Sequence, residues 1–310
     1  MSEYKYLFGP VPSRRLGRSL GVDIVPLKVC SQNCIYCQLG VNADTVLERA
    51  EYININEVLS ELKSAVEKGL DADYITLTGS GEPTLNSRIG DLIDGIRRLT
   101  NIPVAILTNG TLFNDPKVRS DCAKADVVMP SLDAGDEETF KKMNRPHSDI
   151  KFNEFIEGLC KFRKDYCGRI WLEVFFCEGI NTDPEQIDNI RRIVERIGPD
   201  RVQLNTSVRP TVEKDVVRVD PVKLMEIALV LGLNSEVIAD FSRLRKGDQI
   251  DAETERIVEM LKRRPCTLDD ICNGLGAVRN EVAKIISVLE AENQLVIEEL
   301  DSGTYYSVHS

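Results

Sequence analysis

Short apolar runs alternate with amphipathic patterns along roughly the first three quarters of the chain. The apolar runs predict six buried strands, at residues 22–25, 74–78, 104–108, 127–130, 170–176 and 201–205. Between them, apolar residues recur at spacings of three and four, which predicts helices at residues 57–68, 88–99, 116–123, 153–166 and 184–197. Alternating strands and helices predict an α/β fold with parallel strands covered by helices. Six such units form either a partial (β/α)6 TIM-like barrel or an open doubly wound sheet, and periodicity alone does not choose between these two.

The pattern changes near residue 239. A polar stretch without clear periodicity predicts a linker, and after it the pattern indicates a helix, a short helix, a turn, a helix and a hairpin. Thr267 and the acidic residues after it are typical of a helix start. This order of elements is typical of a small winged helix-turn-helix domain. The predicted domains are a barrel at residues 1–238, a linker at 239–250 and a winged helix-like domain at 251–310.

Composition excludes several classes of protein. The 310 residues are 42% hydrophobic, too apolar for a disordered chain, yet no run approaches the ~18 apolar residues of a membrane-spanning helix. The start of the chain has no signal-peptide pattern, and nine cysteines are an odd number, so we expect reduced thiols and a cytoplasmic location. The net charge of −11 argues against a broad basic surface for nucleic acid.

Charge also bears on the predicted C-terminal domain. Residues 250–310 contain six Lys and Arg but twelve Asp and Glu, a net charge of −6. Phosphate neutralisation is the main source of nonspecific DNA affinity, so DNA is an unexpected partner. We expect instead a module that docks a protein or peptide, or a cap on the barrel.

Three cysteines lie within eight residues, in the segment Cys30-Ser-Gln-Asn-Cys34-Ile-Tyr-Cys37. Thiolates are soft ligands that favour zinc, Cu(I) or iron–sulfur clusters. A structural zinc site normally needs four protein ligands, and His147 and His309 are the only histidines. Three cysteines on a cubane cluster would leave one iron open for a chelating substrate. The alternative is three buried cysteines that happen to be close.

The spacing CxxxCxΦC, with Tyr36 before the last cysteine, resembles the signature of the radical S-adenosylmethionine (SAM) superfamily. Ser80-Gly-Glu-Pro83 resembles the GGEP segment of that family, apart from Ser80 in place of the first glycine, and Thr108-Asn-Gly110 and Ser131-Leu-Asp133 follow the next two strands. The resemblance covers roughly residues 8–235 and implies the six-unit partial barrel. The segments around Arg18 and Gly40 look like a poorly characterised group of Fe–S oxidoreductases, related to radical enzymes of wyosine tRNA synthesis.

The resemblance implies that Cys30, Cys34 and Cys37 bind a [4Fe–4S] cluster and that SAM chelates its fourth iron. Glu82 would accept hydrogen bonds from the SAM amino group, and Asp133 would accept them from ribose hydroxyls. The residues implied on the SAM side are Tyr36, Ser80, Gly81, Glu82, Pro83, Asn109, Ser131 and Asp133. Without the cysteine motif, Gly-Glu-Pro would be explained as a common turn. Asn109 and Asp133 are explained equally well as helix caps.

The implied reaction is reductive cleavage of SAM to methionine and a 5′-deoxyadenosyl radical, which acts on an unidentified RNA, peptide, protein or metabolite. A reducing partner such as flavodoxin or ferredoxin would supply the electron. The alternative function is an iron–sulfur sensor that binds a cluster without cleaving SAM and acts through the helix-turn-helix module.

Substrate-side candidates lie on the last predicted strands. Strand alternation places Glu173 and Cys177 on one face, at the edge where ligands gather in such folds, and Asn205 alternates with apolar neighbours. The alternatives are a core thiol, a rim carboxylate and an amide bonded to nearby loops. Arg14, Arg15 and Arg18 form a basic cluster that would suit a phosphate or carboxylate, or would be a solvated loop.

Overall fold

The computed structural model of the chain describes residues 4–39, 44–207, 213, 216–239, 252–277, 279–300 and 303–308. Most of the predicted linker, residues 240–250, lies outside these ranges, so the domain boundaries stay predictions.

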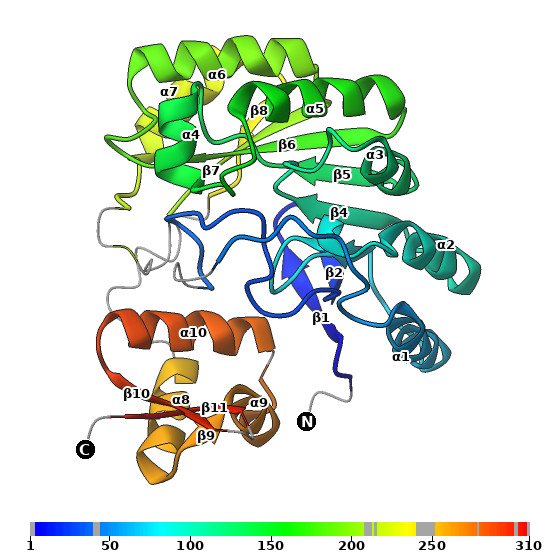
Figure 1. Cartoon of the computed structure of the whole chain (residues 1–310), viewed down its shortest axis with the longest axis vertical. Helices are drawn as coiled ribbons and strands as arrows, with labels where there is room; N and C mark the ends of the chain where they lie inside the picture. The colour runs from blue at the N-terminus through cyan, green and yellow to red at the C-terminus, as the bar shows by residue number, and fades with distance from the viewer. Residues whose placement is uncertain are drawn as a thin grey trace.

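One sheet of eight strands organises the larger part of the chain (Figure 1). Its strands are β1 (Leu7–Ser13), β2 (Gly17–Val22), β3 (Tyr74–Leu77), β4 (Val104–Thr108), β5 (Val127–Pro130), β6 (Arg169–Phe176), β7 (Arg201–Thr206) and β8 (Ser235–Val237). Each strand pairs with the next one in sequence; β1 is antiparallel to β2, and all later pairs are parallel. A doubly wound sheet reverses its strand order, so this consecutive order confirms the α/β partial barrel.

Helices cover the outer face of the sheet (Figure 1). They are α1 (Ile55–Glu67), α2 (Ile89–Leu99), α3 (Pro116–Cys122), α4 (Glu137–Asn144), α5 (Phe152–Asp165), α6 (Pro184–Ile197) and α7 (Pro221–Leu231), with a 3-10 turn η1 at Pro83–Leu85. The main core lies between these helices and the sheet and includes Ile75, Ile106 and Leu172. A smaller cluster around Trp171 and Met129 uses the alternate strand residues, which face the barrel interior.

The first predicted strand was wrong. The apolar run at residues 22–25 predicts a strand there, but β2 covers Gly17–Val22 and pairs with an unpredicted strand β1. Ile24 and Val25 instead lie in the loop after β2, where both are buried. Gly17 and Gly21 disguise β2, and pairing with β1 and β3 makes the segment a strand.

Two further α-helices and one strand of the barrel were not predicted: α4, α7 and β8. Helix α4 has only two large apolar residues, Phe140 and Met143, too few to show a period. Helix α7 is apolar on most sides, and Leu229 remains 80% exposed, so it shows no clear amphipathic face.

The C-terminal unit contains α8 (Ala252–Arg263), α9 (Leu268–Leu275), α10 (Arg279–Ala291) and the strands β9 (Cys266–Thr267), β10 (Leu295–Leu300) and β11 (Gly303–Val308). The sheet order is β10-β11-β9, and both pairings are antiparallel. Thr267 and Asp270 form a capping box at the start of α9, at the predicted helix start. The order of helices and hairpin follows the prediction, while the winged-helix assignment stays a prediction.

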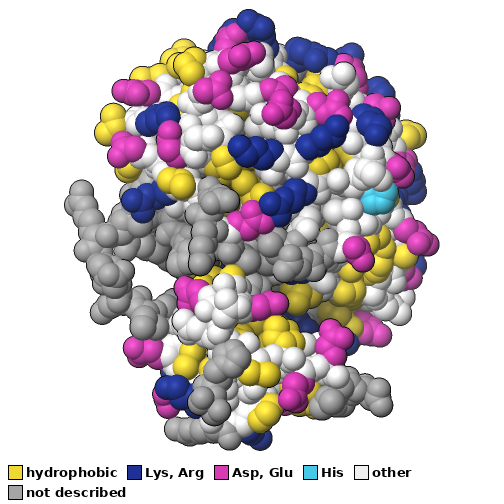
Figure 2. Space-filling model, turned by 60° about the vertical axis from the view of Figure 1, so that its left-hand side comes forward, with side chains coloured by type: hydrophobic (Ala, Val, Ile, Leu, Met, Phe, Trp, Pro, Cys, Tyr) yellow, Lys and Arg dark blue, Asp and Glu magenta, His cyan; other side chains and the backbone are white. Residues whose placement is uncertain are grey.

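Acidic and basic side chains are interspersed over the face shown in Figure 2. Among the residues that the structure describes, no helix is both long and apolar enough to cross a membrane.

Candidate cofactor site

The three cysteines lie in the long connection between β2 and α1, and the end of α4 holds this loop in place. The backbone N–H groups of Asn33 and Ile35 donate to the carbonyl oxygens of Asn144 (3.0 Å) and Met143 (2.9 Å). A further bond runs from the His147 N–H to the Ser31 oxygen at 3.0 Å. Arg145, in the left-handed region at φ 42°, ends α4 at this point. The unpredicted helix α4 therefore shapes the cysteine loop.

The three thiols are largely enclosed and lie near one another. Burial raises the pKa of Cys30 to about 12 and also raises those of Cys34 and Cys37; the charges of neighbouring cysteines contribute for Cys30 and Cys34. Among the described residues, no three Cys, His, Asp or Glu side chains converge on a point where one metal ion would sit. A cubane offers each cysteine a different iron, so its ligands need no common point.

Gly81 lets the Ser80–Pro83 turn approach the cysteine loop. A Cβ on Gly81 would lie 2.1 Å from the carbonyl oxygen of Val29. Two backbone hydrogen bonds join the segments, from Lys28 N–H to the Ser80 oxygen (2.6 Å) and from Glu82 N–H to the Val29 oxygen (2.9 Å). The glycine is therefore needed for contact between two protein segments, besides any ligand contact.

The Glu82 carboxylate is buried and accepts four hydrogen bonds from the protein. Oε1 accepts from the Thr84 N–H (3.0 Å), the Thr84 hydroxyl (2.5 Å) and the Thr108 hydroxyl (2.6 Å). Oε2 accepts from the Asn109 N–H at 2.7 Å. Burial raises the pKa of Glu82, while these donors lower it. The carboxylate therefore ties the Ser80–Pro83 turn to the end of β4.

Asn109 extends this connection to the cysteines. Its Nδ2 lies 2.9 Å from the Ser31 hydroxyl and 3.6 Å from Cys30 Sγ, and its Oδ1 accepts from the Thr111 N–H at 3.0 Å. The Ser80 hydroxyl is 2.5 Å from Asp23 Oδ2, so that side chain also has a protein partner. Pro83 opens the η1 turn and is buried.

A second cluster of contacts surrounds Tyr36. Its hydroxyl donates to Asp133, and its ring stacks on Phe175 with centroids 4.1 Å apart. Asp133 Oδ1 accepts from the Phe175 N–H at 2.9 Å, and Oδ2 accepts from Asn144 Nδ2 at 2.7 Å. Burial raises the pKa of Asp133 to about 6. Ser131, beside it, forms an isolated bridge with Glu173 on β6.

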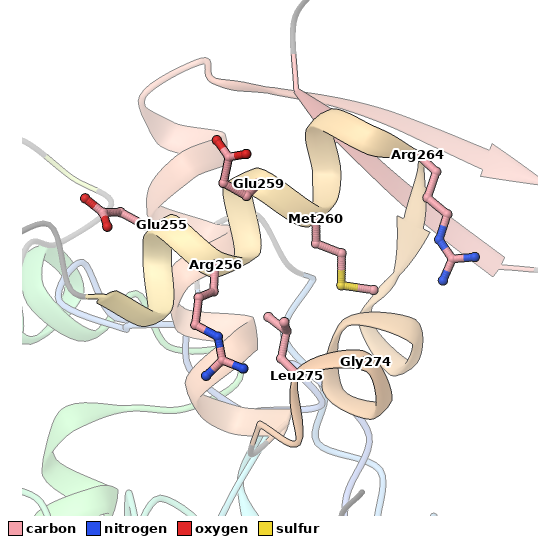
Figure 3. Close-up of a pocket in the computed structure, with 7 residues that line it drawn as sticks. All are labelled: Glu255, Arg256, Glu259, Met260, Arg264, Gly274 and Leu275. Atoms are coloured by element: carbon pink, nitrogen blue, oxygen red, sulfur yellow. The ribbon is translucent and has the colours of Figure 1, made fainter.

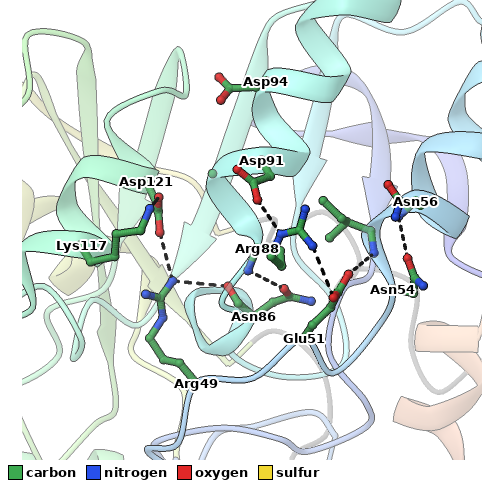
Figure 4. A network of polar contacts seen from close by, with 12 residues as sticks. Arg49, Glu51, Asn54, Asn56, Asn86, Arg88, Asp91, Asp94, Lys117 and Asp121 are labelled. Atoms are coloured by element: carbon green, nitrogen blue, oxygen red, sulfur yellow. Dashed lines mark hydrogen bonds and ion pairs between the residues drawn. The ribbon is translucent and has the colours of Figure 1, made fainter.

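Polar contacts also fix the far end of the cysteine-bearing connection (Figure 4). Arg49 Nε donates to the Thr84 oxygen at 2.9 Å, and its Nη2 lies 3.3 Å from Asp121 Oδ2. The fully buried Asn86 donates to the Ile24 oxygen at 2.9 Å. The connection is therefore anchored on both sides of the cysteines.

Glu173 lies in the barrel interior, where it forms an ion pair with Arg15 and accepts a hydrogen bond from Asn205 Nδ2 at 2.9 Å. Burial raises the pKa of Glu173, but the charges of Arg15 and Arg14 and the two hydrogen bonds outweigh it, so the pKa is lowered. Glu173 and Asn205 are thus joined in the barrel interior, with Arg15 as a further partner, and their substrate-side role stays a prediction.

The remaining candidates have protein partners. Cys177 is fully buried in one cluster with Ile35 and Met143, and its role stays a prediction. Arg14 donates to the Ile238 oxygen, and Arg18 pairs with Asp71 and Asp73 at the surface.

The residues around the thiols fit an iron–sulfur cluster. Amide N–H groups of Asn109 and Asn144 point at Cys30 Sγ (3.6 Å) and Cys34 Sγ (3.5 Å), as donors to cluster sulfurs do. Lys28 and Lys284 lie close enough to lower the pKa of Cys37 by their charge. Enclosed soft donors with adjacent N–H groups and cations are suited to a cluster rather than to a hard cation.

A pocket outside this site lies between α8 and α9 of the C-terminal unit (Figure 3). Met260 and Leu275 meet there, with two arginines and two glutamates around them. None of the predicted site residues lines it.

Comparison with known proteins agrees with this site. Residues 24–187, which include all three cysteines, match the radical SAM superfamily. The chain belongs to the radical SAM superfamily, whose members use a [4Fe–4S] cluster and SAM. Within it, the chain is 34% identical over 308 residues to the UPF0026 protein MJ1312 of Methanocaldococcus jannaschii, covering 96% of this chain and 94% of that protein.

A protein of Brachyspira hyodysenteriae named GTPase Obg is 40% identical over 302 residues, but the chain spans only 44% of its length. Among solved structures, a radical SAM methyltransferase from Sphaerobacter thermophilus has a TM-score of 0.52 at 16% identity, covering 71% of this chain and 66% of that one. Streptococcus suis SuiB bound to S-adenosylmethionine has a TM-score of 0.54 at 16% identity, covering 76% and 54%. These two likenesses concern the fold alone. The chain is a radical SAM enzyme with an unspecified reaction.

Proposed function

We propose that Cys30, Cys34 and Cys37 bind a [4Fe–4S] cluster with which this enzyme cleaves SAM reductively. The observation that carries the proposal is the enclosed cysteine triplet with amide donors directed at two of its sulfurs. The chemistry that this group supplies is one-electron cleavage of SAM to methionine and a 5′-deoxyadenosyl radical. The electron donor would be a flavodoxin or ferredoxin, and the substrate an RNA, a peptide or protein, or a metabolite.

The chain's own residues would position the two cofactors. Asn109 and Asn144 would orient the cysteine sulfurs, and the Ser80–Pro83 turn would present its backbone to the methionyl group. Glu82 would fix that turn mainly through Oε1, which accepts three protein hydrogen bonds. Its Oε2 accepts one, from the Asn109 N–H, and would be able to accept another from the SAM amino group. Tyr36, Ser131 and Asp133 would lie on the nucleoside side.

The test is anaerobic cluster reconstitution, chemical reduction and assay for 5′-deoxyadenosine. Wild type should form it, and Cys34→Ala should not. Cys167→Ala is the matched control because Cys167 is exposed, in the turn between α5 and β6. Absence of product from wild type, or equal product from Cys34→Ala, would contradict the proposal. Cluster binding without SAM cleavage would favour the iron–sulfur sensor instead.

The C-terminal unit would cap the cysteine loop. Leu39, two residues after Cys37, packs against the core of that unit. Figure 1 shows α10 on the side of the unit that faces the barrel, and the charge of Lys284 on α10 acts on Cys37. These contacts, with the acidic balance of the unit, favour a cap over DNA binding.

Lys284→Gln tests the cap, with Lys262→Gln as its control. Both lysines pair with a glutamate three residues earlier, at 2.8 and 2.7 Å. Removing a cation near the cluster should lower its reduction potential, whereas Lys262→Gln should leave it unchanged. Equal potentials in both variants and wild type, or tight binding of random duplex DNA at physiological salt, would contradict the cap.

A further inference from the structure

Asn144 is a buried side chain to which neither the sequence nor the family signature assigns a role. It is the last residue of α4 and 2% exposed. Its backbone oxygen accepts from the Asn33 N–H at 3.0 Å, so it is fixed directly against the cysteine loop.

The surroundings determine which way the amide points. Nδ2 lies 2.7 Å from Asp133 Oδ2 and 3.5 Å from both Cys34 Sγ and the Tyr36 hydroxyl. A carboxylate oxygen and a cysteine sulfur are hydrogen-bond acceptors. The Tyr36 hydroxyl donates its proton to Asp133, so its oxygen is also an acceptor toward Asn144. Rotating the amide by half a turn would place Oδ1 against the Asp133 carboxylate. The N–H groups therefore face Cys34 and Asp133.

This orientation leaves Oδ1 on the opposite side. No donor among the described residues lies within hydrogen-bonding distance of this buried oxygen. Buried carbonyl oxygens are nearly always paired, so an unpaired one beside a predicted cofactor site points to a donor on a bound molecule. In contrast, both polar atoms of the buried Asn181 are paired, with Cys177, Asp133 and Phe175.

We propose that Asn144 binds SAM: its Nδ2 holds Cys34 and Asp133, while its Oδ1 accepts a hydrogen bond from an N–H or O–H group of the ligand. The groups of SAM that can donate are the ammonium of its methionyl part, the ribose hydroxyls and the adenine amino group. The inference rests on the proposed function and adds a residue from α4 to the site.

The experiment measures SAM affinity of the reconstituted protein by anaerobic equilibrium dialysis, and the EPR spectrum of the reduced cluster with and without SAM. Asn144→Ala should weaken SAM binding about tenfold, equivalent to 1.4 kcal/mol. It should also reduce the spectral change that SAM produces. Asn234→Ala removes a hydrogen bond to the Pro199 oxygen (2.9 Å) just before β8 and should leave the affinity within about twofold of wild type.

5′-Methylthioadenosine, which lacks the amino-acid part, locates the donor. If the tenfold loss persists with this ligand, the donor is on the nucleoside; if it disappears, the donor is the ammonium group. Should Asn144→Ala fail to retain about four irons per chain, Asn144→Val, close in volume, replaces it in the same comparison. Unchanged SAM affinity and spectrum in a variant with an intact cluster would overturn the inference.

This outcome is distinct from failure of the proposed function. If the proposed function fails, wild type itself neither responds to SAM in its spectrum nor forms 5′-deoxyadenosine. If only the role of Asn144 fails, wild type shows the spectral response to SAM and forms 5′-deoxyadenosine, and the Asn144 variant binds SAM with the same affinity as wild type.

Discussion

The hydroxyl of Tyr36 donates a hydrogen bond to the carboxylate of Asp133, which joins the cysteine loop to the end of β5. The Tyr36 ring also stacks on Phe175 of β6. One side chain therefore connects the loop to two adjacent strands through one polar and one aromatic contact.

Tyr36→Phe separates these two contacts. The ring stacking should persist, while loss of the buried hydrogen bond should lower the free energy of unfolding by about 1–2 kcal/mol. The measurement is anaerobic urea denaturation. Tyr52→Phe is the control, because the exposed Tyr52 hydroxyl donates only to the Glu48 oxygen, at 2.8 Å. Equal losses in the two variants would show that the Asp133 contact is worth no more than a surface hydrogen bond.

Gly81→Ala should disrupt the contact between the Ser80–Pro83 turn and the cysteine loop. The new methyl group would lie 2.1 Å from the Val29 oxygen, so backbone must move. Iron content after reconstitution should fall well below that of wild type. Gly69→Ala has open space around its Cβ and only left-handed strain (φ 86°), about 1–2 kcal/mol, and should keep its iron. Full iron content in Gly81→Ala would contradict the expectation.

Thr108→Val tests the role of Glu82 as a connector. Valine keeps the shape but removes the hydroxyl that donates to Glu82 Oε1 at 2.6 Å. The loss of a hydrogen bond to a buried carboxylate should cost about 1.5–3 kcal/mol of stability. The pKa of Glu82 should also rise further, since Thr108 lowers it. Chemical denaturation checks the first effect, and a stability identical to wild type would argue against the connector role.

Glu173→Gln should make stability less dependent on pH. The folded pKa of Glu173 is lowered below its ordinary value, so the carboxylate stabilises the fold above that value, and this contribution is lost as pH falls through the folded pKa. The variant should be less stable than wild type by about 2 kcal/mol at pH 7, with a smaller difference under acid conditions. Urea denaturation at several pH values measures this. The control is Glu195→Gln, at an exposed ion pair with Arg191, which should have almost the same free energy of unfolding as wild type. A stability difference between Glu173→Gln and wild type that does not change with pH would contradict this expectation.

Much of the fold could be predicted from local sequence patterns. Strands β4 and β5 are continuous apolar runs, and helix α6 begins after the Asp183 cap at Pro184 and ends at Gly198, so their bounds were predicted to the residue. The partial barrel then followed from the resemblance, and the strand order confirmed it. The cysteine spacing likewise indicated the superfamily to which the chain belongs.

Residues that act through distant partners could not be predicted in the same way. Asn144 is a helix-end amide in sequence, and only folding places it against Cys34. Arg15 was predicted to bind a phosphate or carboxylate or to lie in a solvated loop, and it pairs with Glu173, 158 positions later. No periodicity or spacing encodes such pairs, because they depend on how the sheet curves.

Arg14 illustrates what that curvature means for folding. It directly follows β1 at one edge of the sheet, and it donates to the oxygen of Ile238, the residue after β8 at the other edge. During synthesis, β1 and β2 leave the ribosome long before residue 238. The contact between Arg14 and Ile238 therefore cannot form until nearly the whole barrel has been made. Such distant contacts slow folding because a long loop must close before they contribute. The contact between Arg14 and Ile238 is therefore expected to be among the last in the barrel to form, after the local pairing of β1 with β2.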